Sequence, residues 1–295
     1  MVAMTTQDTE NLPPQPTRQG KPRKNMTTRI VTGLVMLPLV LFVTFQGDIP
    51  LFLFATLLVV LGALEFYHME QERHLKSNAV VGIATALVVL WAFHIENSAL
   101  WQGAFLTGGA LTFGIELVRG RNLRASVVRV LTTLGGVVYL AVPAGCLLVI
   151  RHLEPFGVNW LYALLFSTWA TDTFAYLFGG MFGKTPLAPR LSPKKTVEGA
   201  IGGILGGIFL PALVLLQMQS LSPATFLLIS IAPFVAIGGD LFESGLKRFF
   251  GVKDSYVPGL NIFPGHGGVL DRIDSLLWVT LCYYAYFVLS GKLGF

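Results

Sequence analysis

The charged residues of this chain gather in one stretch, 240–275, which lies between two long apolar segments. The stretch holds five of the 16 acidic residues and four of the 21 basic residues. Charge this dense beside a lipid bilayer is costly unless something binds there. Paired carboxylates suit a hard cation, and Lys or Arg beside glycine-rich turns suits phosphate. The composition of this stretch therefore predicts a site for a metal ion and a phosphorylated ligand.

The first half of the stretch has the spacing of one helix face. Polar residues stand at i, i+3, i+4, i+7 and i+8, as Asp240, Glu243, Ser244, Lys247 and Arg248. On a helix these side chains form a continuous row. The alternative is an intrahelical ladder of ion pairs, with Asp240 or Glu243 bound to Lys247. We favour a binding face, because the second half of the stretch repeats the same chemistry.

The second half contains His266, Gly267 and Gly268, followed by Asp271, Arg272 and Asp274. Asp271 and Asp274 are three residues apart, so both carboxylates point the same way at the start of the last apolar segment. A helix N-terminus itself attracts anions, and two carboxylates there favour a cation that joins them. The alternative is a simple interaction of the carboxylates with the helix dipole. For His266 we favour a contact with phosphate or substrate over a role as metal ligand.

Two further places carry candidate residues. Asp172 lies inside an apolar segment, where a carboxylate is a functional candidate; the alternative is a hydrogen bond to a neighbouring Thr or Tyr. Lys194 and Lys195 lie in a basic loop, for which topology and attraction to anionic lipid are the alternative explanation. Glu65 and Glu116 stand near the cytoplasmic ends of apolar segments, where a side chain can simply reach toward water, and we do not choose them as site residues.

These residues must be positioned by elements within a membrane. The chain has 295 residues, of which 53% are apolar and 13% charged, with a mean hydropathy of +0.65. Soluble domains carry about 25% charged residues, so a multi-span membrane protein is predicted. The cysteines Cys146 and Cys282 fall in apolar segments and are expected to be core residues without a disulfide. Residues 1–28 are predicted to be a disordered tail, and 29–295 a single membrane domain.

Helices are the element expected in lipid, because backbone polar groups must be satisfied within the chain. An all-α fold of about nine transmembrane helices is therefore predicted. The expected spans are 30–47, 50–66, 79–95, 99–118, 130–150, 158–179, 199–217, 223–239 and 269–290.

The distribution of charge then predicts the topology. All basic residues except Arg151 and Lys292 fall in the tail or in loops after even-numbered spans. This asymmetry places the N-terminus and the candidate site on the cytoplasmic side and the C-terminus outside. The net charge of +5 reflects topology, and no motif supports nucleic-acid binding. Glycines at 199, 203 and 207 are expected to pack helices closely within the chain, with a homodimer interface as the alternative.

At this point the motifs resemble those of a known family. The runs SGLKRFFGVKD (244–254) and PGHGGVLDRIDS (264–275) resemble the signature of phosphatidate cytidylyltransferases, also called CDP-diacylglycerol synthases. WATDTFAYLFGG, LAPRLSPKKTVEG and GDLFES are similar to that family too, in the same order. The motifs cover 169–275, and the architecture extends the likeness to about 29–295. The chain departs from the family in a longer link over 255–265 and in Val197, where Trp is more usual.

The resemblance implies that CTP and phosphatidate react to give CDP-diacylglycerol and pyrophosphate at the cytoplasmic face of the inner membrane. It implies Mg²⁺ as cofactor, with Mn²⁺ as an alternative, and membrane lipids as partners. We expect Asp240, Asp271 and Asp274 to hold the metal. We expect Lys247 and Arg248 to act with them in catalysis. The expected substrate-binding residues are Asp172, Lys194, Lys195, Ser244, Lys253, Asp254, His266, Gly267, Gly268 and Arg272.

Two other functions remain open from the sequence. A related CTP-dependent enzyme acting on another lipid phosphate, such as an isoprenoid-ether lipid or a polyprenol, would have similar headgroup chemistry. A transporter is the non-enzymatic alternative. We disfavour transport, because the charges gather at one face and no paired broken helices occur in both halves of the chain.

Overall fold

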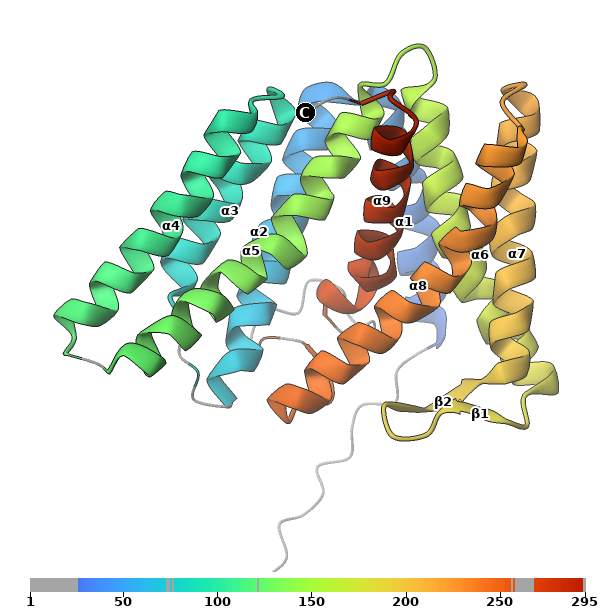
Figure 1. The fold of residues 1–295 in the computed structure, drawn as a ribbon. Helices are drawn as coiled ribbons and strands as arrows, with labels where there is room; N and C mark the ends of the chain where they lie inside the picture. The colour runs from blue at the N-terminus through green and yellow to red at the C-terminus, as the bar shows by residue number, and fades with distance from the viewer. Residues whose placement is uncertain are drawn as a thin grey trace, which may run out of the picture.

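The computed structural model describes residues 26–72, 75, 77–120, 122–255, 257 and 268–293, with side chains from Gly33 onward except that of Glu72. In these ranges the chain forms nine α-helices and one short β-hairpin (Figure 1). The helices are α1 (Met26–Gln46), α2 (Asp48–Glu72), α3 (Ala79–His94), α4 (Ser98–Val118), α5 (Leu123–Arg151), α6 (Gly157–Phe182), α7 (Val197–Gln217), α8 (Pro223–Phe250) and α9 (Leu270–Leu289). The strands are β1 (Pro186–Ala188) and β2 (Ser192–Thr196).

An all-α membrane protein fits this architecture. Within the described residues, four helices are long and apolar enough to cross a membrane: Asp48–Gln71 within α2, and α5, α7 and α8. The apolar parts Gly33–Gln46 and Ala79–His94 are shorter. Large apolar side chains on the outer surfaces of the helices are exposed, such as Phe42, Leu106 and Phe209, as expected where lipid replaces water.

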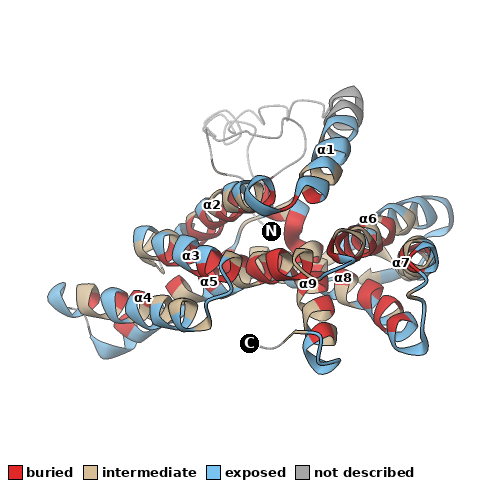
Figure 2. Cartoon of the chain, turned by 90° about the horizontal axis from the view of Figure 1, so that it is seen from above, coloured by how far each residue is buried: buried red, intermediate tan, exposed pale blue. Residues whose placement is uncertain are grey.

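Buried residues concentrate where α5, α8 and α9 meet the surrounding helices (Figure 2). Leu140, Ile150, Leu164, Leu270 and Tyr283 are all essentially inaccessible. The core therefore runs along α5 and α9, and the remaining helices pack around these two.

Two predicted boundaries differ from the structure in a way that matters for function. The span predicted to end at 239 continues as α8 to Phe250, so the polar row of 240–248 belongs to the same helix as the apolar run. The span predicted to begin at 130 starts at Leu123. Polarity marks where a helix leaves lipid, but the backbone hydrogen bonds continue across that border.

The β-hairpin was not predicted. β1 and β2 pair antiparallel, with Pro186 opposite Thr196 and Ala188 opposite Ser192. Glu198 in the first turn of α7 accepts hydrogen bonds from the backbone N–H groups of Lys184 and Thr185 (3.1 and 3.2 Å). The expectation of helices applies only to segments inside lipid. In this polar segment, the backbone N–H and C=O groups find hydrogen-bond partners in the strand pair and in the Glu198 carboxylate.

The glycines of α7 bring it close to α6. A Cβ built on Gly199 would lie 2.7 Å from the carbonyl oxygen of Ala175, and one on Gly203 would lie 2.7 Å from that of Thr171. Only a residue without a side chain permits such an approach. The prediction of close packing within the chain is confirmed, and this packing sets the distance between Asp172 on α6 and the lysines that precede α7.

Candidate active site

A polar cavity of about 710 Å³ opens at one end of the helices, between α6, α8, α9 and the hairpin. The C-terminal ends of α6 and α8 and the N-terminal end of α9 lie at this end of the molecule (Figure 1), and residues of all three line the cavity. The acidic and basic residues that line it are Asp172, Lys194, Lys195, Asp240, Glu243, Lys247, Asp254, Asp271, Arg272 and Asp274. Segments that are far apart in the sequence therefore supply charged groups to a single space.

Helix α8 contributes the row predicted from spacing. Lys247 forms an ion pair with Glu243 one turn before it, and its Nζ atom lies 2.6 Å from Oδ1 of Asp271 on α9. The Glu243 side chain is only 1% exposed. The intrahelical ion pair considered above is thus present, but it is part of a network that joins α8 to α9.

The start of α9 is held by carboxylates. Asp271 accepts a hydrogen bond from the N–H of Gly268 (3.0 Å). Glu65 of α2 accepts from the N–H groups of Val269 and Leu270, both at 2.8 Å, and from the hydroxyl of Ser255 at 3.3 Å. A helix begins with N–H groups that have no partner in the helix, and these carboxylates supply the missing acceptors.

The interpretation of Glu65 as a side chain that reaches toward water was wrong. Glu65 is only 3% exposed, and its hydrogen bonds hold the start of α9, the helix that carries Asp271 and Asp274. The available signal was its position near the end of an apolar run, where an ionisable group needs a partner. The partner lies about two hundred positions away in the chain, and spacing in the sequence does not show such a contact.

Glu116 was misinterpreted in the same way. It is buried in α4 and forms ion pairs with Arg119 (2.9 Å) and with the buried Arg129 of α5 (3.0 Å). The sequence predicts Arg129 in a loop, just before a span that begins at 130, but in the structure it lies in the second turn of α5. This group joins two helices, and neither residue lines the cavity described above.

The other half of the cavity contains Asp172, Asp240 and Asp274. Lys195 forms an ion pair with Asp240. Asp172 and Asp274 lie close enough for their charges to interact with Asp240, with Lys195 and with each other. Asp172 is exposed to the cavity and Asp274 is 7% exposed. The cavity therefore has two clusters of carboxylates, each containing one lysine.

Some predicted site residues lie elsewhere. In the described part of the chain, the predicted residues that are not among those lining the cavity are Ser244, Arg248, Lys253 and Gly268. Arg248 is exposed, because eight residues at about 100° each leave it roughly 80° around the helix from Asp240. His266 and Gly267 lie outside the described residues.

The donor set suits a hard divalent cation. The cavity has six carboxylates against four basic side chains, and an excess of carboxylate oxygen is the chemistry that Mg²⁺ and Ca²⁺ prefer. The predicted ligands Asp240 and Asp271 each lie against a lysine, Lys195 and Lys247. Among the described residues, the group of potential ligands whose atoms lie within 4.8 Å of one another is Asp48, His94 and His152, which is outside this cavity. The triad of Asp240, Asp271 and Asp274 stays a prediction.

Comparison with known proteins agrees with this chemistry. The model of the cytidylyltransferase family matches residues 27–290. A phosphatidate cytidylyltransferase of Bacillus subtilis (strain 168) is 33% identical over 278 residues, which cover 90% of this chain and 98% of that protein. Proteins of the same name from Staphylococcus saprophyticus and Brucella abortus biovar 1 are 32% and 33% identical, over 86% and 89% of this chain and 96% and 93% of their own lengths. The chain therefore belongs to the cytidylyltransferase family.

Proposed function

We propose that this protein is a phosphatidate cytidylyltransferase, which converts CTP and phosphatidate into CDP-diacylglycerol and pyrophosphate. Family membership supports a CTP-dependent nucleotidyl transfer. The observation that carries the proposal is the polar cavity of carboxylates and lysines at the ends of membrane helices. A lipid phosphate and a water-soluble triphosphate can meet only at such a border.

The charge balance supports a role for Mg²⁺, with Mn²⁺ as the alternative. Six carboxylates and four basic groups would repel a triphosphate and a lipid phosphate. Asp240, Asp271 and Asp274 would hold the cation, and Asp172 adds a fourth carboxylate near two of them. When bound, a divalent ion neutralises phosphate charge and stabilises the leaving pyrophosphate.

The residues of the chain bind and align the two phosphates. A phosphate oxygen of phosphatidate attacks the α-phosphorus of CTP, and the bond to the β-phosphate oxygen breaks. The attacking group is already an anion, so no strong general base is needed. Lys194, Lys195, Lys247 and Arg272 would contact phosphate oxygens, and fixed cations of this kind supply most of the catalysis in phosphoryl transfer.

The present partners of the two lysines suggest how binding proceeds. Lys195 lies against Asp240, and Lys247 lies between Glu243 and Asp271. An incoming phosphate offers each lysine a stronger charge-assisted partner. The aspartates that lose their lysines then become free to hold the cation that accompanies the triphosphate.

An apolar cavity of about 450 Å³ supports the lipid part of the proposal. It is lined by residues of α4, α5, α8 and α9, among them Tyr139, Phe242 and Trp278. The Phe242 ring contacts both Tyr139 and Trp278, with ring centroids 5.6 and 5.0 Å apart. Phe242 precedes Glu243, and Trp278 lies about one turn after Asp274. Acyl chains in this cavity would place a lipid phosphate beside the carboxylates.

We also propose that all nine helices cross the membrane, with the N-terminus and the polar cavity on the cytoplasmic side, the C-terminus outside and the protein in the inner membrane. The charge asymmetry of the sequence supports this orientation. So does the need for CTP to reach the cavity from the cytoplasm. Labelling of single cysteines in sealed vesicles tests it: Cys at exposed Lys194 should react only from the cytoplasmic side, and Cys at exposed Glu96 only from outside.

The decisive experiment is a reaction of purified protein with labelled CTP, phosphatidate and Mg²⁺. We expect a lipid-soluble CDP product and one pyrophosphate per turnover. Phosphorylated polyprenols and isoprenoid-ether phosphatidates in parallel reactions distinguish the related enzyme class. Product from one of these lipids but none from phosphatidate would reject the proposed substrate, and solute movement without consumption of CTP would reject the enzyme.

A further inference from the structure

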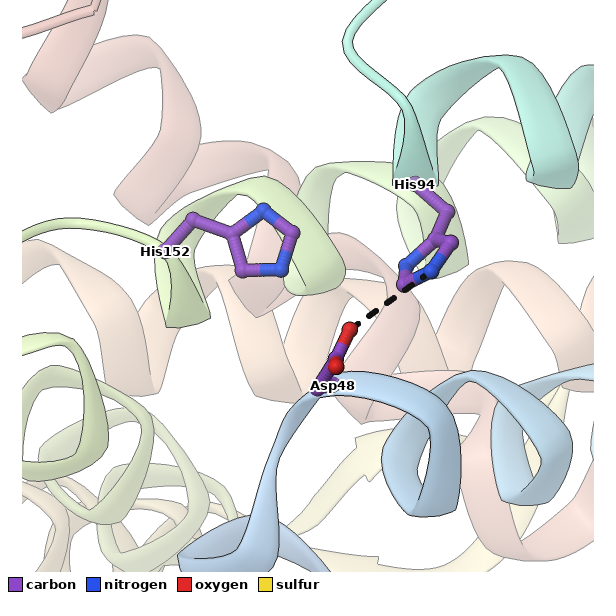
Figure 3. Close-up of side chains that lie close together, drawn as sticks. All are labelled: Asp48, His94 and His152. Carbon is purple, nitrogen blue, oxygen red and sulfur yellow. Dashed lines mark ion pairs between the residues drawn. The ribbon is translucent and has the colours of Figure 1, made fainter.

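We propose that a second metal site, for Zn²⁺ or a similar divalent transition metal, lies at the opposite end of the helices from the polar cavity. Its ligands are Asp48, His94 and His152. Each offers one ligand atom, and these atoms lie within 4.8 Å of one another. The three side chains converge from α2, the end of α3 and the residue after α5 (Figure 3). Two imidazoles and a carboxylate form a set that suits Zn²⁺.

The distances within the cluster fit ligands of one ion. Nε2 of His94 lies 3.7 Å from Oδ1 of Asp48, which is too long for a hydrogen bond. Two ligands at about 2.0–2.1 Å from a tetrahedral ion lie roughly 3.3 Å apart, so a small movement would complete the coordination. The two imidazole rings have centroids 5.9 Å apart.

His152 has the arrangement of a metal-binding histidine. Its Nδ1 atom lies 3.1 Å from Oε1 of Glu96. Histidines that bind metals almost always donate their other ring N–H to a carboxylate or carbonyl, which orients the ring and fixes its tautomer. If Nδ1 donates to Glu96, then Nε2 keeps the lone pair for an ion.

His94, the other histidine of the cluster, has a mostly buried side chain. Its side chain is 8% exposed and packs against Phe52 and Trp91, with ring centroids 4.7 and 5.5 Å away. Its buried Nδ1 atom has no hydrogen-bond partner among the described residues. The nitrogen that lies near Asp48 is Nε2, and an ion bound there would give this buried ring a partner that protein groups do not supply.

Two helix ends also favour a cation, and the backbone around the cluster is held in a defined arrangement. His94 and His152 stand at the C-terminal ends of α3 and α5, where the helix dipoles are negative. Asp48 and Glu96 both have positive φ angles, 36° and 52°, which non-glycine residues rarely adopt. Arg151 donates hydrogen bonds to the carbonyl oxygens of Thr44 and Phe45, both at 2.9 Å, and so ties the end of α5 to the last turn of α1, shortly before Asp48. An ion here would join the ends of α2, α3 and α5.

The test uses tag-free, full-length protein in detergent, with excess Mg²⁺ to occupy oxygen-rich sites. Titration with Co²⁺, which adopts zinc geometries and absorbs visible light, should give one equivalent with the intense bands of tetrahedral coordination. Added Zn²⁺ should remove these bands. The site is independent of the proposed enzyme activity, so the readout is metal binding alone.

Four variants make the test specific. Asp48→Asn and His152→Gln should weaken Co²⁺ binding at least tenfold, and Glu96→Gln should weaken it by about tenfold through loss of the orienting carboxylate. His68→Gln is the matched control, because His68 is a half-buried histidine near the other end of α2 and should leave binding unchanged. Asp48 is largely exposed, so its variant should fold normally.

A wild-type protein without tetrahedral bands overturns the proposal, and so do bands that persist in both Asp48→Asn and His152→Gln. In either case the cluster is an ion-pair group only. A chelator should lower the unfolding temperature of wild type and of His68→Gln but not that of Asp48→Asn. Equal shifts in all three proteins would also count against the site.

Discussion

Glu65 shows how a single residue can matter without reaching a substrate. It binds two N–H groups at the start of α9 and thereby orients Asp271 and Asp274. Glu65→Gln removes the charge and one acceptor, and we expect kcat to fall about tenfold or more while KM for CTP changes little. Loss of the charged hydrogen bonds should cost about 1.5–3 kcal/mol of stability.

Glu116→Gln is the matched control for Glu65. It also changes a buried carboxylate, but Glu116 binds Arg119 and Arg129 away from the cavity. Removing one partner of a buried ion pair costs about 3–5 kcal/mol. We therefore expect Glu116→Gln to lower stability with kcat per folded enzyme unchanged. An equal loss of kcat in both variants would contradict a positioning role for Glu65.

Lys247 and Arg248 distinguish the observed cavity, which only Lys247 lines, from the helix face predicted from sequence spacing, which includes both residues. Lys247 lines the cavity and contacts Asp271, whereas Arg248 is exposed next to it. Lys247→Ala should reduce kcat/KM by about tenfold to a hundredfold, as expected for a charge-assisted phosphate contact of about 1.5–3 kcal/mol. Arg248→Ala should have a smaller effect. Steady-state kinetics with varied CTP measures both, and an equal or larger loss in Arg248→Ala would contradict this geometry and favour a role for both residues, as the spacing predicted.

Asparagine variants of Asp271 and Asp274 test whether these two residues bind the proposed Mg²⁺ ion. Asparagine keeps the size and one acceptor oxygen, so Asp271→Asn and Asp274→Asn should lower turnover strongly and require more Mg²⁺ for half-maximal rate. A titration of turnover with Mg²⁺ and with Mn²⁺, on variants shown to be monodisperse, gives the answer. Wild-type metal dependence in both variants would remove these residues from the metal site.

At the scale of elements, the close packing of α6 against α7 sets the distance between Asp172 on α6 and the lysines Lys194 and Lys195 that precede α7. A Cβ at Gly203 would meet a backbone carbonyl at 2.7 Å, which cannot move aside as a side chain can. We expect Gly203→Ala to lower stability by about 1–3 kcal/mol and to reduce activity. Denaturant unfolding in detergent and turnover measure the two effects.

Gly114→Ala is the control for this prediction. Its Cβ on α4 would have nothing within 4 Å, and alanine in a helix is favoured over glycine by up to about 1 kcal/mol. This variant should be as stable as wild type or more so. A Gly203→Ala protein as stable as Gly114→Ala would show that helix propensity, and not close packing, decides the effect of alanine at position 203.

At the scale of the whole molecule, the family match begins at residue 27, and the segment before it has the composition of a disordered tail. We expect a protein that starts at Met26 to insert, fold and turn over CTP at the wild-type rate. Turnover per inserted protein is the measurement. A truncated protein that inserts normally but is inactive would assign the tail a catalytic role.

The sequence by itself determined the helices and the chemistry. Apolar runs of this length can satisfy their backbone in lipid only as helices, so the predicted spans begin and end within a few residues of most observed helices. The motifs between 169 and 275 carry the residue types that a phosphate site needs. Nine of the ten acidic and basic residues that line the cavity were named from the sequence as catalytic or substrate-binding. The tenth, Glu243, was seen only as part of a helix face.

Only the tertiary structure decided which residues meet. Glu65 lies in the second helix and contacts the start of the last one. Lys195 of the hairpin meets Asp240 of α8, and Arg248 is exposed although its neighbour Lys247 lines the cavity. The cluster of Asp48, His94 and His152 comes from three segments that show no common motif. Local spacing governs which side chains share a face, but contacts between distant helices depend on packing, which periodicity in one segment does not contain.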